Sequence, residues 1–172
     1  MTLFDTDVLS LDGIEIKNEK GESIGTVQPS SRRMQVLNSD SETPILFFEK
    51  KFQLKLHPDI EIKDEKGKVI AFLKKKEGWF KKKYIMENPQ GIVILKNETN
   101  ENQETIQDDK GVKIAEVIKK EPSFKELIRG KFPIWTLTID NTDFDRIMIF
   151  SFFASRYAAD NFKEDVMGYV PS

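Results

Sequence analysis

The chain has 172 residues, a net charge of −2 and 33% charged residues. This length fits one domain, residues 1–172, and lets one core bury most of the apolar surface of the unfolded chain. The near-neutral charge gives no argument for nucleic acid as a partner. The absence of cysteine excludes disulfides, thiolate nucleophiles and cysteine-based metal sites.

The first residues, Met1-Thr-Leu-Phe-Asp-Thr-Asp, contain no basic region and no apolar run, so they do not form a signal peptide. The apolar stretch near the other end is shorter than the roughly 20 residues that span a bilayer. We therefore expect a cytoplasmic protein, which a lipid-binding role would place at the inner surface of the membrane.

A two-strand pattern occurs three times along the chain. Residues 14–27, 60–73 and 106–117 each contain an apolar strand, a turn of the form Asn/Asp-x-Lys-Gly and a second apolar strand. The Asn or Asp side chain bonds its own backbone to start the turn, and Gly supplies the positive φ. A small residue stands at the same place in each return strand: Gly25, Ala71 and Ala115. We expect a bulky group to approach the sheet closely there.

Further strands are predicted where apolar residues alternate or form short runs between turn residues. These strands lie at residues 45–48, 51–56, 79–86, 92–95 and 134–139. In the last of them, the alternation directs Trp135, Leu137 and Ile139 inwards. Residues 97–105 are polar and are predicted to form a loop. Residues 124–128 fit either one helical turn or an edge strand.

About ten to twelve strands, between about residues 12 and 140, predict an antiparallel barrel or sandwich. They are followed by residues 147–154, which are all apolar except Ser151. A helix that is apolar on every side is buried. We expect this helix to run over about residues 142–160, with Thr142 as N-cap and Asp145 completing a capping box, and with a tail at residues 161–172.

The predicted fold class is mainly β (α+β), a closed antiparallel β-barrel of about twelve strands around a central hydrophobic C-terminal helix. A rival interpretation makes the helix a membrane-inserted anchor. Burial inside the barrel is favoured, because the inward apolar positions of the strands otherwise lack a core.

The chain resembles the tubby C-terminal-like superfamily, in particular its phospholipid-scramblase and LURP-one-related branch. The hairpins at residues 64–71 and 108–115, the strand at residues 134–139 and the apolar helix carry the likeness. It covers roughly residues 47–162, with the first hairpin as an extension. The resemblance implies a closed barrel of about twelve strands threaded by the C-terminal helix.

The resemblance also implies a set of activities. Tubby domains bind phosphoinositide headgroups through basic residues on the barrel surface. Scramblases are linked to phospholipid movement, and they carry an acidic calcium-binding segment and palmitoylated cysteines. This chain has no cysteine, and Asp140, Asp143 and Asp145 match the acidic segment only loosely. Both departures argue against scramblase activity.

One strongly basic stretch is the candidate binding site. This lysine patch consists of Lys74, Lys75, Lys76, Trp79, Lys81, Lys82 and Lys83. Lysines beside an aromatic residue suit an anionic membrane surface, where each lysine contributes about 1 kcal/mol. The alternative is a solvated strand face, on which lysines prevent edge-to-edge aggregation. Nucleic acid is not an expected partner, since no basic stripe or stacking module accompanies the patch.

The remaining candidates have structural explanations. The three acids Asp140, Asp143 and Asp145 fall short of the six to eight oxygens of a calcium site, and helix capping explains two of them. His57, the single histidine, is expected in a surface turn and has no partners for a zinc site or a catalytic triad. We therefore expect no catalytic residue, no metal and no cofactor.

These observations predict a non-enzymatic binding module. The leading hypothesis is peripheral binding to anionic phospholipid headgroups through the lysine patch. The alternative is a protein-interaction scaffold that uses the barrel rim and tail, with an unknown protein partner. Phospholipid scramblase-like activity is a distant third.

Overall fold

The computed structural model describes residues 3–30, 33–40, 43–51, 59–76, 83–100, 103–141 and 143–158. Its strands are β1 (Val8–Asp12), β2 (Glu15–Lys17), β3 (Ser23–Ser30), β4 (Arg33–Asn38), β5 (Pro44–Lys50), β6 (Ile60–Asp64), β7 (Val69–Lys76), β8 (Lys83–Glu87), β9 (Val93–Asn100), β10 (Gln103–Asp108), β11 (Lys113–Lys120) and β12 (Ile134–Ile139). Its helices are α1 (Phe124–Ile128), α2 (Arg146–Phe153) and a π-helix (Ala154–Ala158).

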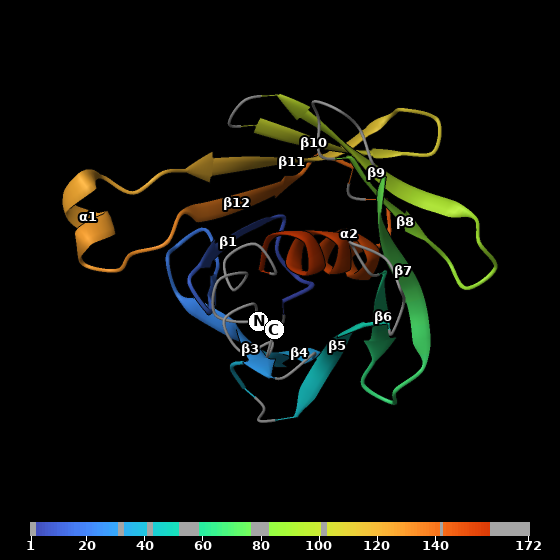
Figure 1. The fold of residues 1–172 in the computed structure, drawn as a ribbon, viewed down its shortest axis with the longest axis horizontal. Coiled ribbons are helices and arrows are strands. Elements are labelled where there is room, and N and C mark those ends of the chain that lie inside the picture. Colours follow the sequence, from blue (N-terminus) through green and yellow to red (C-terminus); the bar gives the residue numbers. More distant parts are fainter. Residues whose placement is uncertain are drawn as a thin grey trace, which may run out of the picture.

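The twelve strands form a closed antiparallel barrel (Figure 1). Consecutive strands pair with each other around the ring, and β1 pairs with β12 to close it, with Leu11 opposite Trp135. A closed ring has no unpaired sheet edge. The strands were predicted to begin at about residue 12, but β1 starts earlier, at Val8. In addition, β4 lies in a segment for which no strand was predicted.

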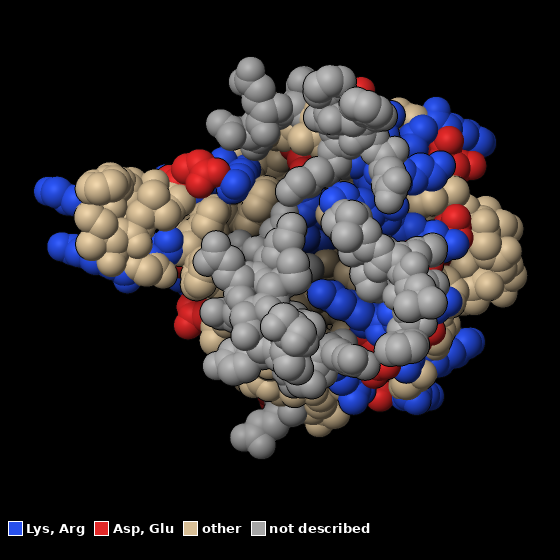
Figure 2. Space-filling model, viewed as in Figure 1, with Lys and Arg blue, Asp and Glu red and all other residues tan. Residues whose placement is uncertain are grey.

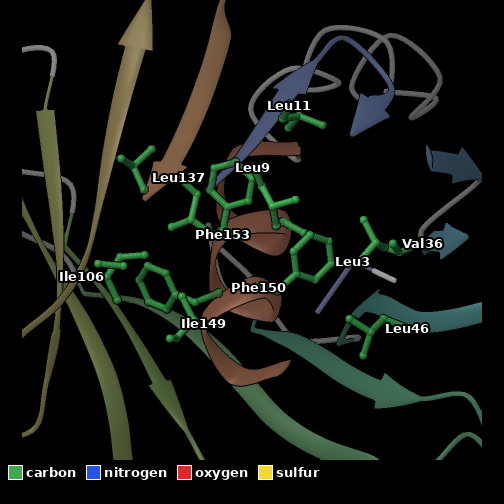
Figure 3. Close-up of a cluster of buried hydrophobic side chains, with 14 of the residues drawn as sticks. Leu3, Leu9, Leu11, Val36, Leu46, Ile106, Leu137, Ile149, Phe150 and Phe153 are labelled. Carbon is green, nitrogen blue, oxygen red and sulfur yellow. The ribbon is translucent and has the colours of Figure 1, made fainter. Parts of the chain in front are cut away.

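Side chains that alternate along the strands point into one apolar core. In β12, Trp135, Leu137 and Ile139 are all buried, as the alternation predicted. They share this core with residues of most other strands and of α2. Figure 3 shows Phe150 and Phe153 of α2 beside strand residues such as Leu9.

The repeated hairpin is confirmed, and it occurs four times among the described residues. In each copy the first turn residue accepts backbone N–H bonds through its side-chain oxygen, and the glycine three positions later has a φ of 81° to 86°. Each first strand also has a register shift just before the turn. The four turns start at Asn18, Asp64, Asn88 and Asp108. The turn at Asn88 was missed as a copy because Gln90 replaces the lysine.

The close approach predicted at the small residues has a definite cause at Gly25. A Cβ atom on Gly25 would lie 2.7 Å from the carbonyl oxygen of Leu37 and 3.1 Å from the side chain of Leu3. The bulky neighbour here is therefore the N-terminal Leu3, itself fully buried. Ala71 and Ala115 are also completely buried.

The predicted helix over about residues 142–160 is shorter in the structure. α2 has only eight residues, and the backbone changes to a π-helix at Ala154. The predicted capping box is wrong: Asp145 is the N-cap, and its Oδ1 accepts from the N–H of Ile147 at 2.9 Å. Thr142 lies outside the described residues.

Other segment predictions are partly corrected. The polar loop predicted over residues 97–105 is wrong, because β9 continues to Asn100 and β10 begins at Gln103. Residues 124–128 form α1, so of the two predicted alternatives the helical turn is confirmed and the edge strand is wrong. The strand predicted over residues 79–86 begins at Lys83, and the strand at 51–56 lies, apart from its first residue, outside the described residues. Among the described helices, none has the length and apolarity to cross a membrane.

Gly25→Ala should lower the free energy of unfolding by about 1–3 kcal/mol, because the added methyl group must displace a backbone carbonyl. Urea unfolding followed by circular dichroism measures this change. Ser23→Ala on the exposed part of the same strand is the control, expected within about 0.5 kcal/mol of wild type. Equal unfolding midpoints for Gly25→Ala and wild type would contradict the close approach.

Candidate functional site

β8 and β9 are paired over only part of their length. Their register joins Ile85 to Lys96, Met86 to Leu95 and Glu87 to Val93. Beyond Ile85, β8 stays paired with β7, and β9 stays paired with β10 as far as Asn100. The two strands therefore separate towards this end, and we call the gap between them the β8–β9 opening.

A side chain replaces the missing backbone ladder at this opening. The N–H of Tyr84 donates to Oδ1 of Asn97 at 2.7 Å. Asn97 is 5% exposed, so its amide fills a position where a backbone carbonyl would otherwise accept this N–H. A buried N–H without an acceptor would be costly, and the Asn97 amide lets the strands diverge without that cost.

A hollow of about 350 Å³ occupies the opening. It is lined by Lys76, Lys83, Tyr84, Ile85, Lys96, Asn97, Glu98, Thr99 and Gln107. Three of these residues are lysines and one is a carboxylate. That carboxylate, Glu98, accepts from Nε2 of Gln107 at 2.8 Å. The lining is therefore polar and has an excess of positive charge.

The lysines reach the hollow because of strand alternation. Lys76 lies opposite Lys83 in the register of β7 and β8, so both side chains leave the same face of the sheet. Lys96 lies opposite Ile85 and alternates with the buried Leu95 and Asn97, which places it on the outer face too. On the face drawn in Figure 2, lysine and arginine atoms gather over the side of the barrel that β7, β8 and β9 form.

The lysine patch predicted from the sequence is brought together only in part. Lys76 and Lys83 line the hollow. Lys74 instead binds Glu87, with 2.9 Å between Nζ and Oε2, and this hydrogen bond raises the pKa of Lys74. Lys75 lies opposite Tyr84 and so shares its face. Trp79, Lys81 and Lys82 lie outside the described residues.

A set of polar side chains extends from the lining of the hollow to the buried Glu104 and Arg156. We call this set the inner polar network: Tyr84, Asn97, Glu104 and Arg156. Arg156 of the π-helix donates through Nη2 to Oε1 of Glu104 at 3.4 Å. Its guanidinium carbon lies 4.3 Å from the centre of the Tyr84 ring. The Asn97 amide donates to Oε2 of Glu104 at 3.2 Å. The network thus ties the end of the helical segment to the wall beside the opening.

Sequence reasoning missed Lys96, Asn97, Glu104 and Arg156. Asn97, Glu104 and Arg156 are at least nine-tenths buried. Their polarity had instead favoured a loop for the first two and a helix end for Arg156. A signal was present, since Asn97 continues the alternation of Leu95, and Glu104 that of Ile106. Period-two spacing from an apolar residue marks the inward face of a strand whatever the polarity of the next residue.

The acidic residues singled out in the sequence do not join this site. Asp140 pairs with Lys113 at 3.2 Å, and Asp145 caps α2. The N–H of Asp143 donates to the side chain of Asn141. In the described part of the chain, no group of three or more His, Cys, Asp or Glu residues is arranged to hold a metal ion. His57 lies outside it.

Glu104→Gln should lower the free energy of unfolding by about 3 kcal/mol, because Arg156 stays buried without its carboxylate. Chemical denaturation measures this loss. Glu98→Gln, at an exposed position of the neighbouring strand, should change stability by less than about 0.5 kcal/mol. The double variant Glu104→Leu, Arg156→Met should recover much of the loss, since it leaves no buried charge. Equal stability of Glu104→Gln and wild type would contradict the inner polar network.

Comparison with known sequences places this chain in a family. The family described as LURP-one-related has a sequence model that matches residues 4–154. This range includes every strand and α2. Comparisons with the curated proteins and with the solved structures give no significant match. With a match over most of its length, the chain belongs to the LURP-one-related family, a member of the tubby-like and scramblase superfamily.

Proposed function

We propose that this protein is a non-enzymatic binding module that holds anionic phospholipid headgroups at the β8–β9 opening. One observation carries the proposal: Lys76, Lys83 and Lys96 surround a polar hollow, and among the described residues of its lining the single carboxylate is Glu98. An excess of ammonium groups around a concave surface attracts phosphate by charge.

The size and chemistry of the hollow support a headgroup as the ligand. Its volume of about 350 Å³ lies at the small end of ligand-binding pockets. The amides of Asn97 and Gln107 and the hydroxyl of Thr99 belong to its lining, and such groups suit a phosphorylated polar molecule better than an acyl chain. The lysines of the lining lie on the outer face of the sheet, the face on which a headgroup would approach.

We propose binding without catalysis and assign no catalytic residue to the described lining. It contains no histidine, and its carboxylate Glu98 is held by Gln107. Glu104 lies behind the hollow and is bound to Arg156 and Asn97. Both carboxylates are thus engaged by neighbouring side chains.

Lysine reversal tests the headgroup proposal. The triple variant Lys76→Glu, Lys83→Glu, Lys96→Glu should lose most of its co-sedimentation with vesicles that contain phosphatidylglycerol or a phosphoinositide. Each lysine contributes about 1 kcal/mol at such a surface, so the affinity should fall by at least about a hundredfold. Wild-type binding should also weaken as salt is raised from 0.05 to about 0.5 M, because ions screen the lysines.

The control is the triple variant Lys20→Glu, Lys66→Glu, Lys110→Glu. It changes the net charge by the same amount at exposed hairpin turns, so it separates the opening from general charge. Equal losses in both triple variants would contradict a specific site. Absence of vesicle binding by the wild type at low salt would contradict the lipid proposal and favour a protein-interaction scaffold.

We further propose that α2 is the central hydrophobic helix of the barrel and has no part in binding. Ile149, Phe150, Phe152 and Phe153 are each at most 1% exposed and belong to the same core as the strand residues. The ring of Phe150 meets that of Phe4 edge to face, with 5.7 Å between centroids. These contacts support a helix that fills the barrel, in place of one that enters a membrane.

Phe152→Asp should therefore unfold the whole domain, with a loss above about 4 kcal/mol, because it buries an unpaired charge. Phe124→Asp is the matched control, since Phe124 is exposed on α1 and should change stability by less than about 0.5 kcal/mol. Circular dichroism and urea unfolding measure both variants. A folded Phe152→Asp protein with weaker membrane binding would instead support the anchor interpretation.

A further inference from the structure

The chain between β11 and β12 stands away from the barrel as an arm. The pairing of the two strands continues to Lys120 and Ile134, and residues 121–133 follow at the end of this ribbon. We call these residues the α1 arm. Figure 1 shows α1 at the far end of the arm, beyond the ring of strands.

The arm has a defined fold of its own. Ser123 is the N-cap of α1, and its hydroxyl accepts from the N–H of Glu126 at 3.3 Å. Gly130 ends the helix with a φ of 78°, and its N–H donates to the carbonyl of Leu127. Capping at both ends holds such a short helix in place. These bonds define the backbone of the arm, which carries its side chains outwards.

The arm exposes large apolar side chains. Phe124 is 77% exposed, Ile128 71%, Leu127 57% and Phe132 44%. The first three are spaced three and four residues apart, which places them on one face of the helix. None of the four belongs to the barrel core. A contiguous apolar group at a projecting tip marks a contact surface.

Positive charges accompany these apolar side chains. Lys125, Arg129 and Lys131 are exposed, and Glu126 is the single acid between residues 124 and 132. In the described part of the chain, none of the three cations forms an ion pair. In Figure 2 the projecting arm is mostly tan, with blue lysine and arginine atoms at its outer end.

We propose that the α1 arm inserts Phe124, Leu127, Ile128 and Phe132 into the interfacial layer of an anionic phospholipid bilayer. Aromatic and aliphatic side chains flanked by Lys and Arg are the composition of helices that lie in this layer. The three cations then face the lipid phosphates. This inference goes beyond headgroup binding at the β8–β9 opening, because it concerns a different surface and an apolar contact.

The charges of the arm favour a membrane over a second copy of this chain. In a two-fold dimer the same surface of each copy meets its equivalent, so a contact through residues 124–132 would bring six cations together against two acids. An anionic bilayer neutralises the same cations. The arm also projects beyond the ring of strands (Figure 1), so its tip can enter a soft interface without a complementary groove.

The absence of cysteine gives a direct test. Ile128→Cys, labelled with an environment-sensitive fluorophore, is mixed with phosphatidylcholine vesicles that contain phosphatidylglycerol. We expect a blue shift, a severalfold rise in emission and quenching by lipids that carry a bromine or spin label near the headgroup. Asp109→Cys at the exposed turn between β10 and β11, labelled in the same way, should show none of these changes.

A second variant pair separates insertion from folding. Phe124→Asp with Leu127→Asp should reduce partitioning into these vesicles by at least about tenfold, with an unchanged unfolding midpoint. The label reports on the arm alone, so its response does not depend on whether the lysines of the opening bind headgroups. An Ile128 label that stays in water at saturating lipid would overturn the proposal. Concentration-dependent self-association abolished by the Asp pair, without any vesicle response, would overturn it in favour of a protein contact.

Discussion

Antiparallel pairing between β1 and β12 joins the first described strand to the last, and this contact leaves the barrel without an edge. Closure also creates an interior that excludes water. Side chains must fill this interior. Leu9 and Leu11 of β1, Leu137 of β12 and Phe153 of α2 meet there. The N-terminal Leu3 packs into the same interior, and together with the carbonyl oxygen of Leu37 it crowds the space that a Cβ atom at position 25 would take.

Much of the fold could be predicted because its rules are local. The turns at Asn18, Asp64 and Asp108 can be recognised in the sequence. Each needs one side chain that accepts from the nearby backbone and one glycine with positive φ. Helix boundaries were less predictable, since Asp145 and Thr142 are both competent caps and only the approach of the chain from β12 decides between them. Ring closure depends on pairing across more than a hundred residues, for which the family resemblance was the better guide.

The site was harder to predict than the fold. Lys76 and Lys83 were found because charge is visible in a sequence, but their neighbour Lys96 lies on a third strand segment and joins them only through the register with Ile85. The inner polar network is less visible still. Glu104 and Arg156 are 52 residues apart, and buried polar residues are uncommon enough that a polar segment favours a loop. The burial of Glu104 and Arg156 can be recognised only in the folded chain, where the two side chains pair.

The four hairpins share their turn, their register shift and the inward direction of the residue two positions before the turn, such as Ile16 and Ile106. A unit with these properties carries its own register, so a tandem duplication of its coding segment would add two correctly paired strands at once. An antiparallel ring can close only with an even number of strands, because neighbours alternate in direction. Growth by whole hairpins always meets this parity condition, and the twelve-stranded barrel satisfies it.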